Sequence, residues 1–400
     1  MKSKRLRVYI CLVTDHGLGL WHRQFPAALK AMGHEVHVAE GLGISESGPL
    51  SQAGLWTKSD RARLTERIFE DFATEHRRQR FDLFFAFLYP VQFDPELFDH
   101  VAALGTPSVY YFCDNLFHQE VARRYARHAT LNWVPEKAAM RNFKAAGARA
   151  VHLPMAANPS ENFSVGGGES LDVIFPGARN PFRRQVLGYA ISKGVDLTLF
   201  GSGWIPSQIS HNLINYQATA QAPLNSAGRW HRLNQWLTFK STALVRFCRH
   251  GLRPARESRA YAKLGEEYES LVRQHAHPET VDLARLNALY SEARVTIGIN
   301  DQFNPVSIPA LYCYPKMREF EATMSGACYL TQRTEETEDL FDTEKEIAVY
   351  SSPEELVEKT RELLGSPTRR AQMRVAAARR SNSDHTWQRR FETIFRELGL

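Results

Sequence analysis

Several features that would narrow the class of this protein are absent from its 400 residues. The five cysteines form no C-x-x-C pair and show no disulfide-like spacing, so we expect reduced, buried thiols. The longest apolar run, Leu83–Tyr89, is far shorter than the ~20 residues that a membrane-spanning helix needs. The run Val8–Val13 after the basic N-terminus is too short for a secretory signal. We therefore expect a cytoplasmic protein that neither spans the membrane nor is secreted by this route.

Metal-binding and nucleic-acid-binding patterns are absent as well. No two aspartates are spaced D-x-D, and the histidines show no ligand spacing typical of zinc. The formal charge of +6 is mild, and no nucleic-acid-binding module is recognisable. We therefore expect no bound metal, no resident cofactor and no nucleic-acid partner.

What is present indicates two α/β domains. With 43% hydrophobic and 24% charged residues, the composition is that of a soluble globular protein, and the length suits two domains. Within residues 1–157, short apolar runs alternate with helical patterns, which predicts a doubly wound parallel sheet. A linker rich in Gly, Asn and Ser follows at 158–170, and a second α/β pattern occupies 171–383.

The stretch 318–350 combines a helix, a tight turn, a strand, an acidic helix and another strand. Apolar residues recur at i, i+3 and i+7 and are expected to face a core: Met317, Phe320 and Met324. Arg318 and Glu321 fall on another stripe, side by side and away from the packing face. Gly326 ends the helix. A cation beside a hydroxyl-binding carboxylate suits a nucleotide diphosphate, although a simple surface ion pair is the plain structural alternative.

Two glycine turns follow strands of the second domain. Gly177 lies between a strand and a helix whose first turn carries Arg183 and Arg184. Free N–H groups at a helix N-terminus, with arginines beside them, favour phosphate binding. Gly201 and Gly203 follow the next strand and let the backbone approach a ligand. A solvated helix start and an ordinary tight turn would explain the same residues.

The stretch 318–350 also resembles the C-terminal signature of the CgeB-like spore-maturation-protein glycosyltransferases, relatives of the group 1 retaining enzymes with the GT-B fold. That signature is R-x-F-E-A-x-x-x-G, an apolar strand, and E-x-x-x-L-F-x-x-x-K-E-I-x-x-Y. It is met here by Arg318, Phe320, Glu321, Ala322, Gly326, Glu336, Leu340, Phe341, Lys345, Glu346, Ile347 and Tyr350. The resemblance implies an α/β protein of GT-B architecture, with two Rossmann-like doubly wound parallel-sheet domains facing a cleft.

The resemblance also implies an activity. A sugar would pass from a nucleotide diphosphate sugar to a hydroxyl of a glycan, a lipid-linked sugar or another acceptor, without metal and with retention, in cell-surface glycan or glycoconjugate synthesis. Glu321 would hold the ribose hydroxyls, and Arg318 with Arg183 or Arg184 would stabilise the leaving diphosphate. The acidic residue that group 1 enzymes often carry seven or eight positions earlier is missing. A GT-B nucleotide-sugar epimerase and a non-catalytic nucleotide-sugar-binding protein are the alternatives.

The N-terminal domain offers fewer candidates. His16, Gly17 and Gly19 follow its first strand, and the glycines resemble the GT-B loop that faces the donor phosphates and the acceptor. Asp114 ends another strand, at the edge where ligands bind in open α/β sheets. His16 could relay a proton, and Asp114 could contact the acceptor or act as a base. Capping of a loop or helix explains such residues equally well.

A basic helical insertion at about 205–280 departs from the family. Gly228–Lys263 contains nine Arg or Lys against one acid, with tryptophans and leucines close to helical spacing. Such a segment suits peripheral contact with an anionic membrane on the inner face, or packing on its own protein. The C-terminal helix, 384–400, has an apolar stripe, and by resemblance to GT-B enzymes it packs back on the N-terminal domain.

Overall fold

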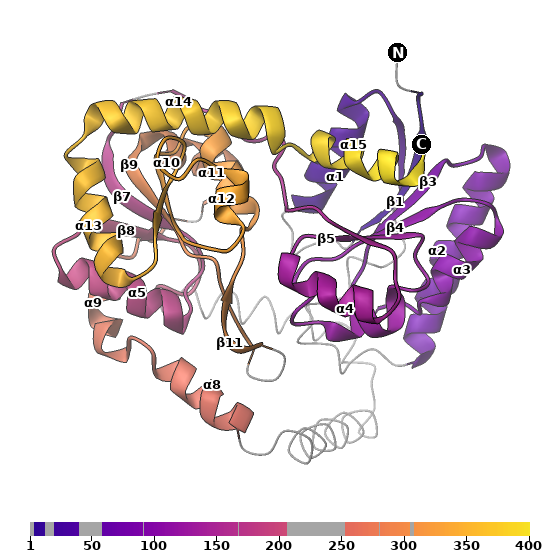
Figure 1. Ribbon diagram of the computed structural model, residues 1–400, viewed down its shortest axis with the longest axis horizontal. Helices are drawn as coiled ribbons and strands as arrows, with labels where there is room; N and C mark the ends of the chain where they lie inside the picture. Colours follow the sequence, from indigo (N-terminus) through magenta and orange to yellow (C-terminus); the bar gives the residue numbers. More distant parts are fainter. Residues whose placement is uncertain are drawn as a thin grey trace. The chain divides into compact units, whose positions relative to one another are not determined.

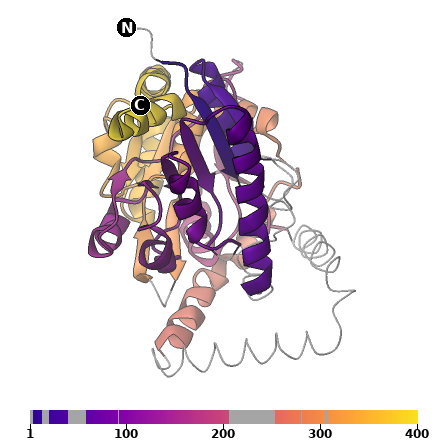
Figure 2. The same cartoon turned by 90° about the vertical axis from the view of Figure 1, so that its right-hand side faces the viewer.

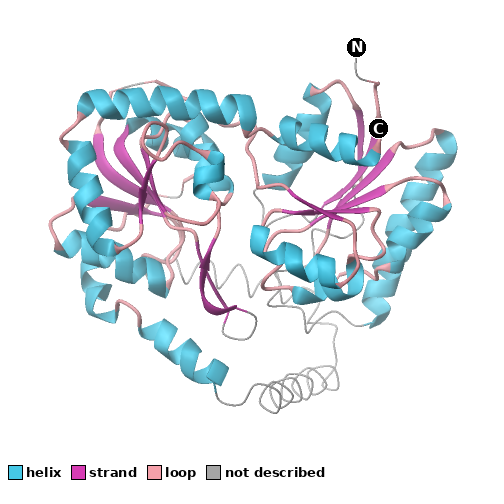
Figure 3. Ribbon diagram, viewed as in Figure 1, coloured by secondary structure: helices cyan, strands magenta, loops and turns pink. Residues whose placement is uncertain are grey.

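The structure is a computed structural model that describes residues 4–12, 20–39, 58–90, 92–166, 168–205, 253–279, 281–304 and 308–400. The chain folds into two compact units. Unit 1 comprises the described residues of Met1–Pro154 and Trp387–Leu400, and unit 2 those of Met155–Ala218 and His250–Thr386. Each unit has a parallel sheet with helices on both faces (Figure 3). The predicted pair of parallel-sheet α/β domains is therefore confirmed.

The sheet of unit 1 has six parallel strands in the order β2-β1-β3-β4-β5-β6. Its inner strands carry nearly continuous apolar runs because helices cover both faces of a parallel sheet. The strand bounds are β1 (Arg7–Leu12), β2 (Glu35–Val38), β3 (Leu83–Phe87), β4 (Ser108–Tyr111), β5 (Leu131–Val134) and β6 (Ala150–His152).

The helices of unit 1 are amphipathic and turn their apolar stripes to this sheet. Helix α2 shows the spacing, since Leu64, Ile68 and Phe72 are buried four residues apart and α2 lies along one face of the sheet (Figure 2). The bounds are α1 (Leu20–Ala31), α2 (Lys58–Arg78), α3 (Glu96–Ala103), the π-helix η3 (Val121–Tyr125), the 3-10 helix η4 (Lys137–Ala139), α4 (Met140–Ala145) and α15 (Trp387–Leu398).

Helix α15, the last helix of the chain, belongs to unit 1 and packs beside α1 (Figure 1). Trp387 is buried, and its indole N–H donates to Gln24 Oε1 at 2.8 Å. Its ring meets Phe25 edge-on at 4.8 Å and Trp133 at 5.7 Å between ring centroids. Such aromatic pairs add to the burial of apolar surface. Residues far apart in the sequence therefore share one core.

The sheet of unit 2 has five parallel strands in the order β13-β12-β9-β7-β8, and β10 and β11 form a separate antiparallel pair. The strand bounds are β7 (Leu171–Pro176), β8 (Leu197–Phe200), β9 (Ala293–Gly298), β10 (Asp301–Asn304), β11 (Ile308–Cys313), β12 (Tyr329–Gln332) and β13 (Ala348–Tyr350). The helices are α5 (Pro181–Ser192), α8 (Arg253–Lys263), the 3-10 helix η5 (Glu266–Tyr268), α9 (Glu269–Gln274), α10 (Leu283–Glu292), α11 (Met317–Met324), α12 (Thr337–Leu340), α13 (Pro353–Leu364) and α14 (Pro367–Asp384).

Side-chain caps fix where three helices of unit 2 begin. Asn180, Asp282 and Ser352 each accept a hydrogen bond from the backbone N–H three residues on. Pro follows the cap in α5 and α13, where its fixed φ suits the first helical turn. None of the described helices is long and apolar enough to cross a membrane.

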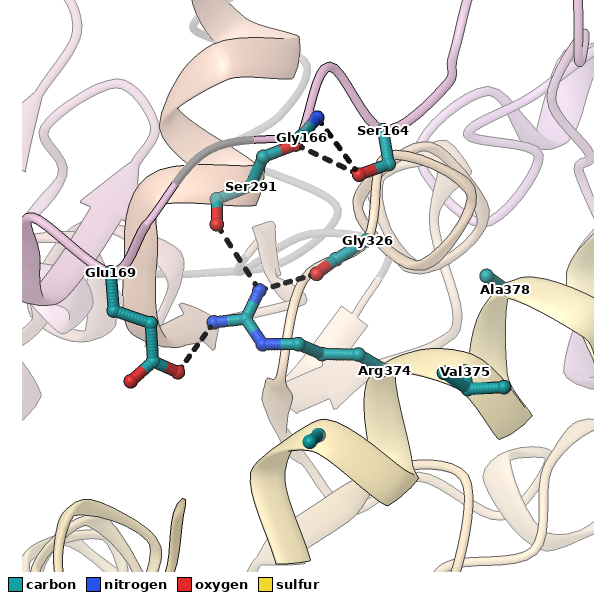
Figure 4. Close-up of a pocket in the computed structure, with 9 residues that line it drawn as sticks. Ser164, Gly166, Glu169, Ser291, Gly326, Arg374, Val375 and Ala378 are labelled. Carbon is teal, nitrogen blue, oxygen red and sulfur yellow. Dashed lines mark hydrogen bonds and ion pairs between the residues drawn. The ribbon is translucent and has the colours of Figure 1, made fainter. Parts of the chain in front are cut away.

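The segment before β7 is tied to α14 by ion pairs. Glu169 accepts from Arg370 Nε at 2.9 Å and from Arg374 Nη2 at 3.2 Å. Arg374 also donates to the backbone carbonyls of Ser291 and Gly326, in a pocket of about 340 Å³ (Figure 4). The polar groups of this pocket are engaged with one another, so we assign it a structural role.

Replacing Glu169 by glutamine is expected to destabilise the protein by about 2 kcal/mol at pH 7, because the buried Arg370 loses a charged partner. The hydrogen bond from Arg370 leads the interactions that lower the pKa of Glu169. The stabilisation is therefore present above the unfolded pKa of about 4.3 and is lost as the pH falls through the folded value.

Urea unfolding between pH 3.5 and pH 8 measures this difference. Glu338→Gln is the matched control, because Glu338 pairs with Arg333 at an exposed site and should matter little. An equal loss in the two variants would contradict the assignment.

Candidate functional site

Two glycine turns lie together at the carboxyl ends of β7 and β8. The Gly177 N–H donates to Phe200 O at 2.8 Å, and the Arg179 N–H donates to Ser202 O at 2.9 Å. Gly201 has φ of +121°, and a Cβ there would lie 2.7 Å from Gly177 O. Only glycine fits at this position. The two turns therefore interlock at the edge where open α/β sheets bind ligands.

Arg318, on the first turn of α11, reaches over this edge. Its guanidinium carbon lies 5.9 Å from the Phe175 ring centroid, and a Cβ on Gly177 would lie 3.2 Å from its Nη1. Burial acts to lower the pKa of Arg318, but the neighbouring Tyr290, Tyr329 and acidic side chains outweigh it and raise the pKa. Arg318 is thus a fixed cation beside the Gly177 turn.

Glu321 lies one turn further along α11 and is only 8% exposed. The sequence-based prediction that Glu321 lies on an exposed stripe is therefore wrong. Every residue of α11 from Glu319 to Met324 is buried. Among the described residues, none forms a hydrogen bond with its carboxylate. Burial raises the pKa of Glu321 to about 7, although the charge of Arg318 acts to lower it. A carboxylate that accepts no hydrogen bond from the described residues can accept hydrogen bonds from a ligand at both of its oxygens.

Arg183 is the second cation at this edge. Its guanidinium carbon lies 5.6 Å from the Phe175 ring, so Arg183 and Arg318 both lie near one aromatic ring. Its Nε donates to Asp301 Oδ1 at 3.0 Å, and its Nη atoms donate to the carbonyls of Ala178 and Ile299. Within the part of the chain that the structure describes, these bonds use three of the five guanidinium N–H groups and leave two for a ligand.

Arg184 points elsewhere. It is buried and donates to Glu269 Oε2 at 2.8 Å and to the carbonyls of Ala262 and Leu264. The structure thus brings Arg183, Arg318 and Gly177 together and does not bring Arg184 to them. Gly203 has φ of +86°, and a Cβ there would meet Arg179, so it shapes the second turn.

Sequence reasoning missed a cluster around Asp301, whose side chain is 2% exposed. Its Oδ2 accepts from Asn180 Nδ2 at 2.8 Å and from the Tyr261 hydroxyl at 3.2 Å. Asp301 comes soon after the apolar strand β9, so its place at the carboxyl edge of the sheet was a signal that could have been used. Tyr261 gave no such signal.

Asp114, in unit 1, is the one non-glycine residue with positive φ, +62°, in the part of the chain that the structure describes. The next residue, Asn115, is held by the buried Glu136, which accepts from its backbone N–H at 2.6 Å and its Nδ2 at 2.7 Å. Burial raises the pKa of Glu136 to about 8, and the charge of Asp114 contributes to this rise. Strain and a buried acid at a sheet edge are typical of functional sites.

The other N-terminal candidates, His16, Gly17 and Gly19, lie outside the described residues. The candidate site is therefore best defined in unit 2, where its members are Gly177, Gly201, Arg183, Arg318 and Glu321.

Comparison with known proteins points to one class. Residues 245–396 match the model of a family described as glycosyl transferase-like. The chain is similar in structure to sucrose-phosphate synthase from Thermosynechococcus elongatus, with 13% identity, a TM-score of 0.57, and coverage of 98% of this chain and 99% of that one. It is also similar to a glycosyltransferase from Rickettsia africae, with 10% identity, a TM-score of 0.57, and coverage of 98% of each chain.

Alr3699/HepE from Anabaena, in complex with UDP and glucose, is also similar, with 12% identity, a TM-score of 0.53, and coverage of 99% of this chain and 100% of that one. No curated protein matches the chain. The chain thus has the GT-B fold, and its C-terminal part matches a glycosyl transferase-like family model. The closer resemblance to the CgeB-like enzymes stays a prediction.

Proposed function

We propose that the protein is a metal-independent, retaining glycosyltransferase that moves a sugar from a nucleoside diphosphate sugar to a hydroxyl group. The observation that carries this proposal is the placement of Arg318 and Arg183 near Phe175, beside the Gly177 turn. Two cations at a glycine turn suit a diphosphate, which gains negative charge as it leaves the sugar. Fixed cations that face this charge stabilise the transition state without reorganisation.

Glu321 completes the donor half of the proposal. Glu321 is 8% exposed, and its carboxylate accepts no hydrogen bond from the described residues. The two hydroxyls of a ribose would supply such donors, one to each carboxylate oxygen. Retention rests on the resemblance of the 318–350 stretch to retaining enzymes.

The acceptor half lies in unit 1. We propose that Asp114 contacts or deprotonates the acceptor hydroxyl, with His16 as a further candidate. The acceptor would be a glycan, a lipid-linked sugar or another hydroxyl compound in cell-surface glycan synthesis. A cytoplasmic enzyme with peripheral contact to an anionic membrane suits that role, and the exposed cations of α8 support such a contact.

A thermal-shift screen with UDP-, GDP-, ADP-, dTDP- and CMP-sugars tests the donor site. We expect at least one nucleoside diphosphate sugar to raise the melting temperature, because a ligand at 100 times its Kd stabilises the folded state by about 2.7 kcal/mol. UDP-sugars are tested first because the structure of Alr3699/HepE contains UDP. CMP-sugars carry one phosphate and are the internal control.

No shift with any diphosphate donor, or an equal shift with CMP-sugars, would contradict the proposal. For the donor selected in this way, release of the nucleoside diphosphate in the presence of candidate acceptors then distinguishes transfer from binding alone.

A further inference from the structure

Helix α8 is linked to both arginines of the first turn of α5, directly to Arg184 and through one shared partner to Arg183. Arg184 donates directly to the carbonyls of Ala262 and Leu264, at 2.9 and 2.7 Å. Arg183 is linked indirectly, because its partner Asp301 also accepts from the Tyr261 hydroxyl at 3.2 Å. The end of α8 is thus connected to a residue of the candidate donor site through one carboxylate.

Stacking reinforces this connection. The rings of Tyr261 and Phe303 lie 4.1 Å apart between centroids and are nearly parallel, at 7°. Phe303 lies on β10, which begins with Asp301. Tyr261 therefore holds both the carboxylate and the strand that carries it, so a displacement of α8 would move Asp301 and loosen the orientation of Arg183.

The opposite side of α8 is basic and exposed. Successive residues of an α-helix are rotated by about 100°, so Arg256, Arg259 and Lys263 form one stripe, roughly opposite Tyr261. All three are exposed. The acid of this helix, Glu257, lies off the stripe and pairs with Arg253 at 3.0 Å. The stripe thus offers three cations to an anionic partner.

We propose that α8 couples an anionic membrane surface to the donor site, a proposal that rests on the proposed function. The basic stripe binds the surface, and Tyr261 transmits this binding to Arg183 through Asp301. An extended negative surface fits a row of cations on one helix face, and three of them give a weak, salt-sensitive contact that suits regulation. Attachment holds α8 in place and keeps two N–H groups of Arg183 directed at the diphosphate.

The test measures two affinities on the full-length protein. The probes are UDP, or the nucleoside diphosphate with the largest thermal shift, and vesicles of mixed phosphatidylglycerol and phosphatidylcholine. We expect anionic vesicles to tighten nucleotide binding roughly fivefold or more, whereas pure phosphatidylcholine vesicles do not. Because coupling is reciprocal, the nucleotide should tighten vesicle binding by the same factor.

Two sets of variants separate the steps. The R256Q/R259Q/K263Q variant should lose vesicle binding and keep nucleotide binding, and R63Q/R77Q/R78Q on α2 is the control with the same change of charge. Tyr261→Phe should keep vesicle binding and lose the coupling, whereas Tyr189→Phe, whose hydroxyl lies beside Glu354, should retain it.

Vesicle binding without any effect on nucleotide affinity would overturn the coupling. Binding of RNA or of acidic protein in preference to anionic vesicles would overturn the membrane partner. If no nucleotide binds, the proposed function fails as well, and vesicle binding, measured separately, shows whether the basic stripe still acts as a surface contact.

Discussion

Replacing Arg318 by methionine is expected to lower kcat/KM for the donor roughly 100- to 1,000-fold, as removal of one transition-state donor does in other enzymes. Arg318 lies over Phe175 at the Gly177 turn, where it would meet the leaving diphosphate. Lysine should restore part of the rate, because it keeps the charge and loses the planar fork. The measurement is release of nucleoside diphosphate from the donor selected by thermal shift.

Folding must be separated from chemistry in this variant. Arg318→Met leaves the buried Glu321 without its neighbouring cation, so R318M/E321Q provides a neutral pair for comparison of melting temperatures. Arg294→Met is the matched control, because Arg294 pairs with Asp172 at the amino-terminal edge of the same sheet. Unchanged nucleoside diphosphate affinity together with unchanged turnover in Arg318→Met would remove Arg318 from the site.

Replacing Glu321 by alanine is expected to raise the donor KM roughly 100-fold or more, because two hydrogen bonds are lost, and to leave the fold intact. Hydrogen bonds to a charged group contribute about 1.5–3 kcal/mol each, and 1.4 kcal/mol corresponds to tenfold in affinity. Calorimetry with a nucleoside diphosphate and its 2′-deoxy analogue tests the contact itself. The wild type should lose affinity for the deoxy analogue, whereas Glu321→Ala should bind both equally.

The raised pKa of Glu321 adds a pH test. Burial raises this pKa to about 7 in the free protein, and the ionised carboxylate is the better acceptor for two hydroxyls. Donor affinity should therefore rise as the pH increases through 7, and this rise should be absent in Glu321→Gln. A nucleoside diphosphate sugar is the suitable probe because its phosphates do not titrate in this range. Equal pH profiles would argue against a role of Glu321 in binding.

Much of the architecture follows from local pattern. Apolar runs such as Leu83–Phe87 predict buried strands because both faces of a parallel sheet are covered, and every residue of this strand is buried. The prediction for α11 was less complete. The helical periodicity of the sequence placed Glu321 on an outer stripe. Periodicity alone cannot show that other elements enclose all sides of a short helix.

The site was harder to predict where its contacts are distant in sequence. The neighbouring Arg183 and Arg184 look alike in the chain, yet one faces Phe175 and the other is bound to Glu269, 85 residues away. Nothing local decides between them. Asp301 bonds to Arg183 from 118 residues further along the chain, and Tyr261 of the basic insertion bonds to Asp301. Only the tertiary structure reveals these contacts.

Helix α15 has a consequence for how this protein is made. Trp387 and Phe391 pack on Phe25 and Trp133 of unit 1, but they follow the whole of unit 2 in the sequence. Unit 1 therefore cannot complete its aromatic core until all of unit 2 has been synthesised. A premature stop before Trp387 would damage the amino-terminal unit, and we expect the nascent chain to need protection from aggregation while unit 2 is made.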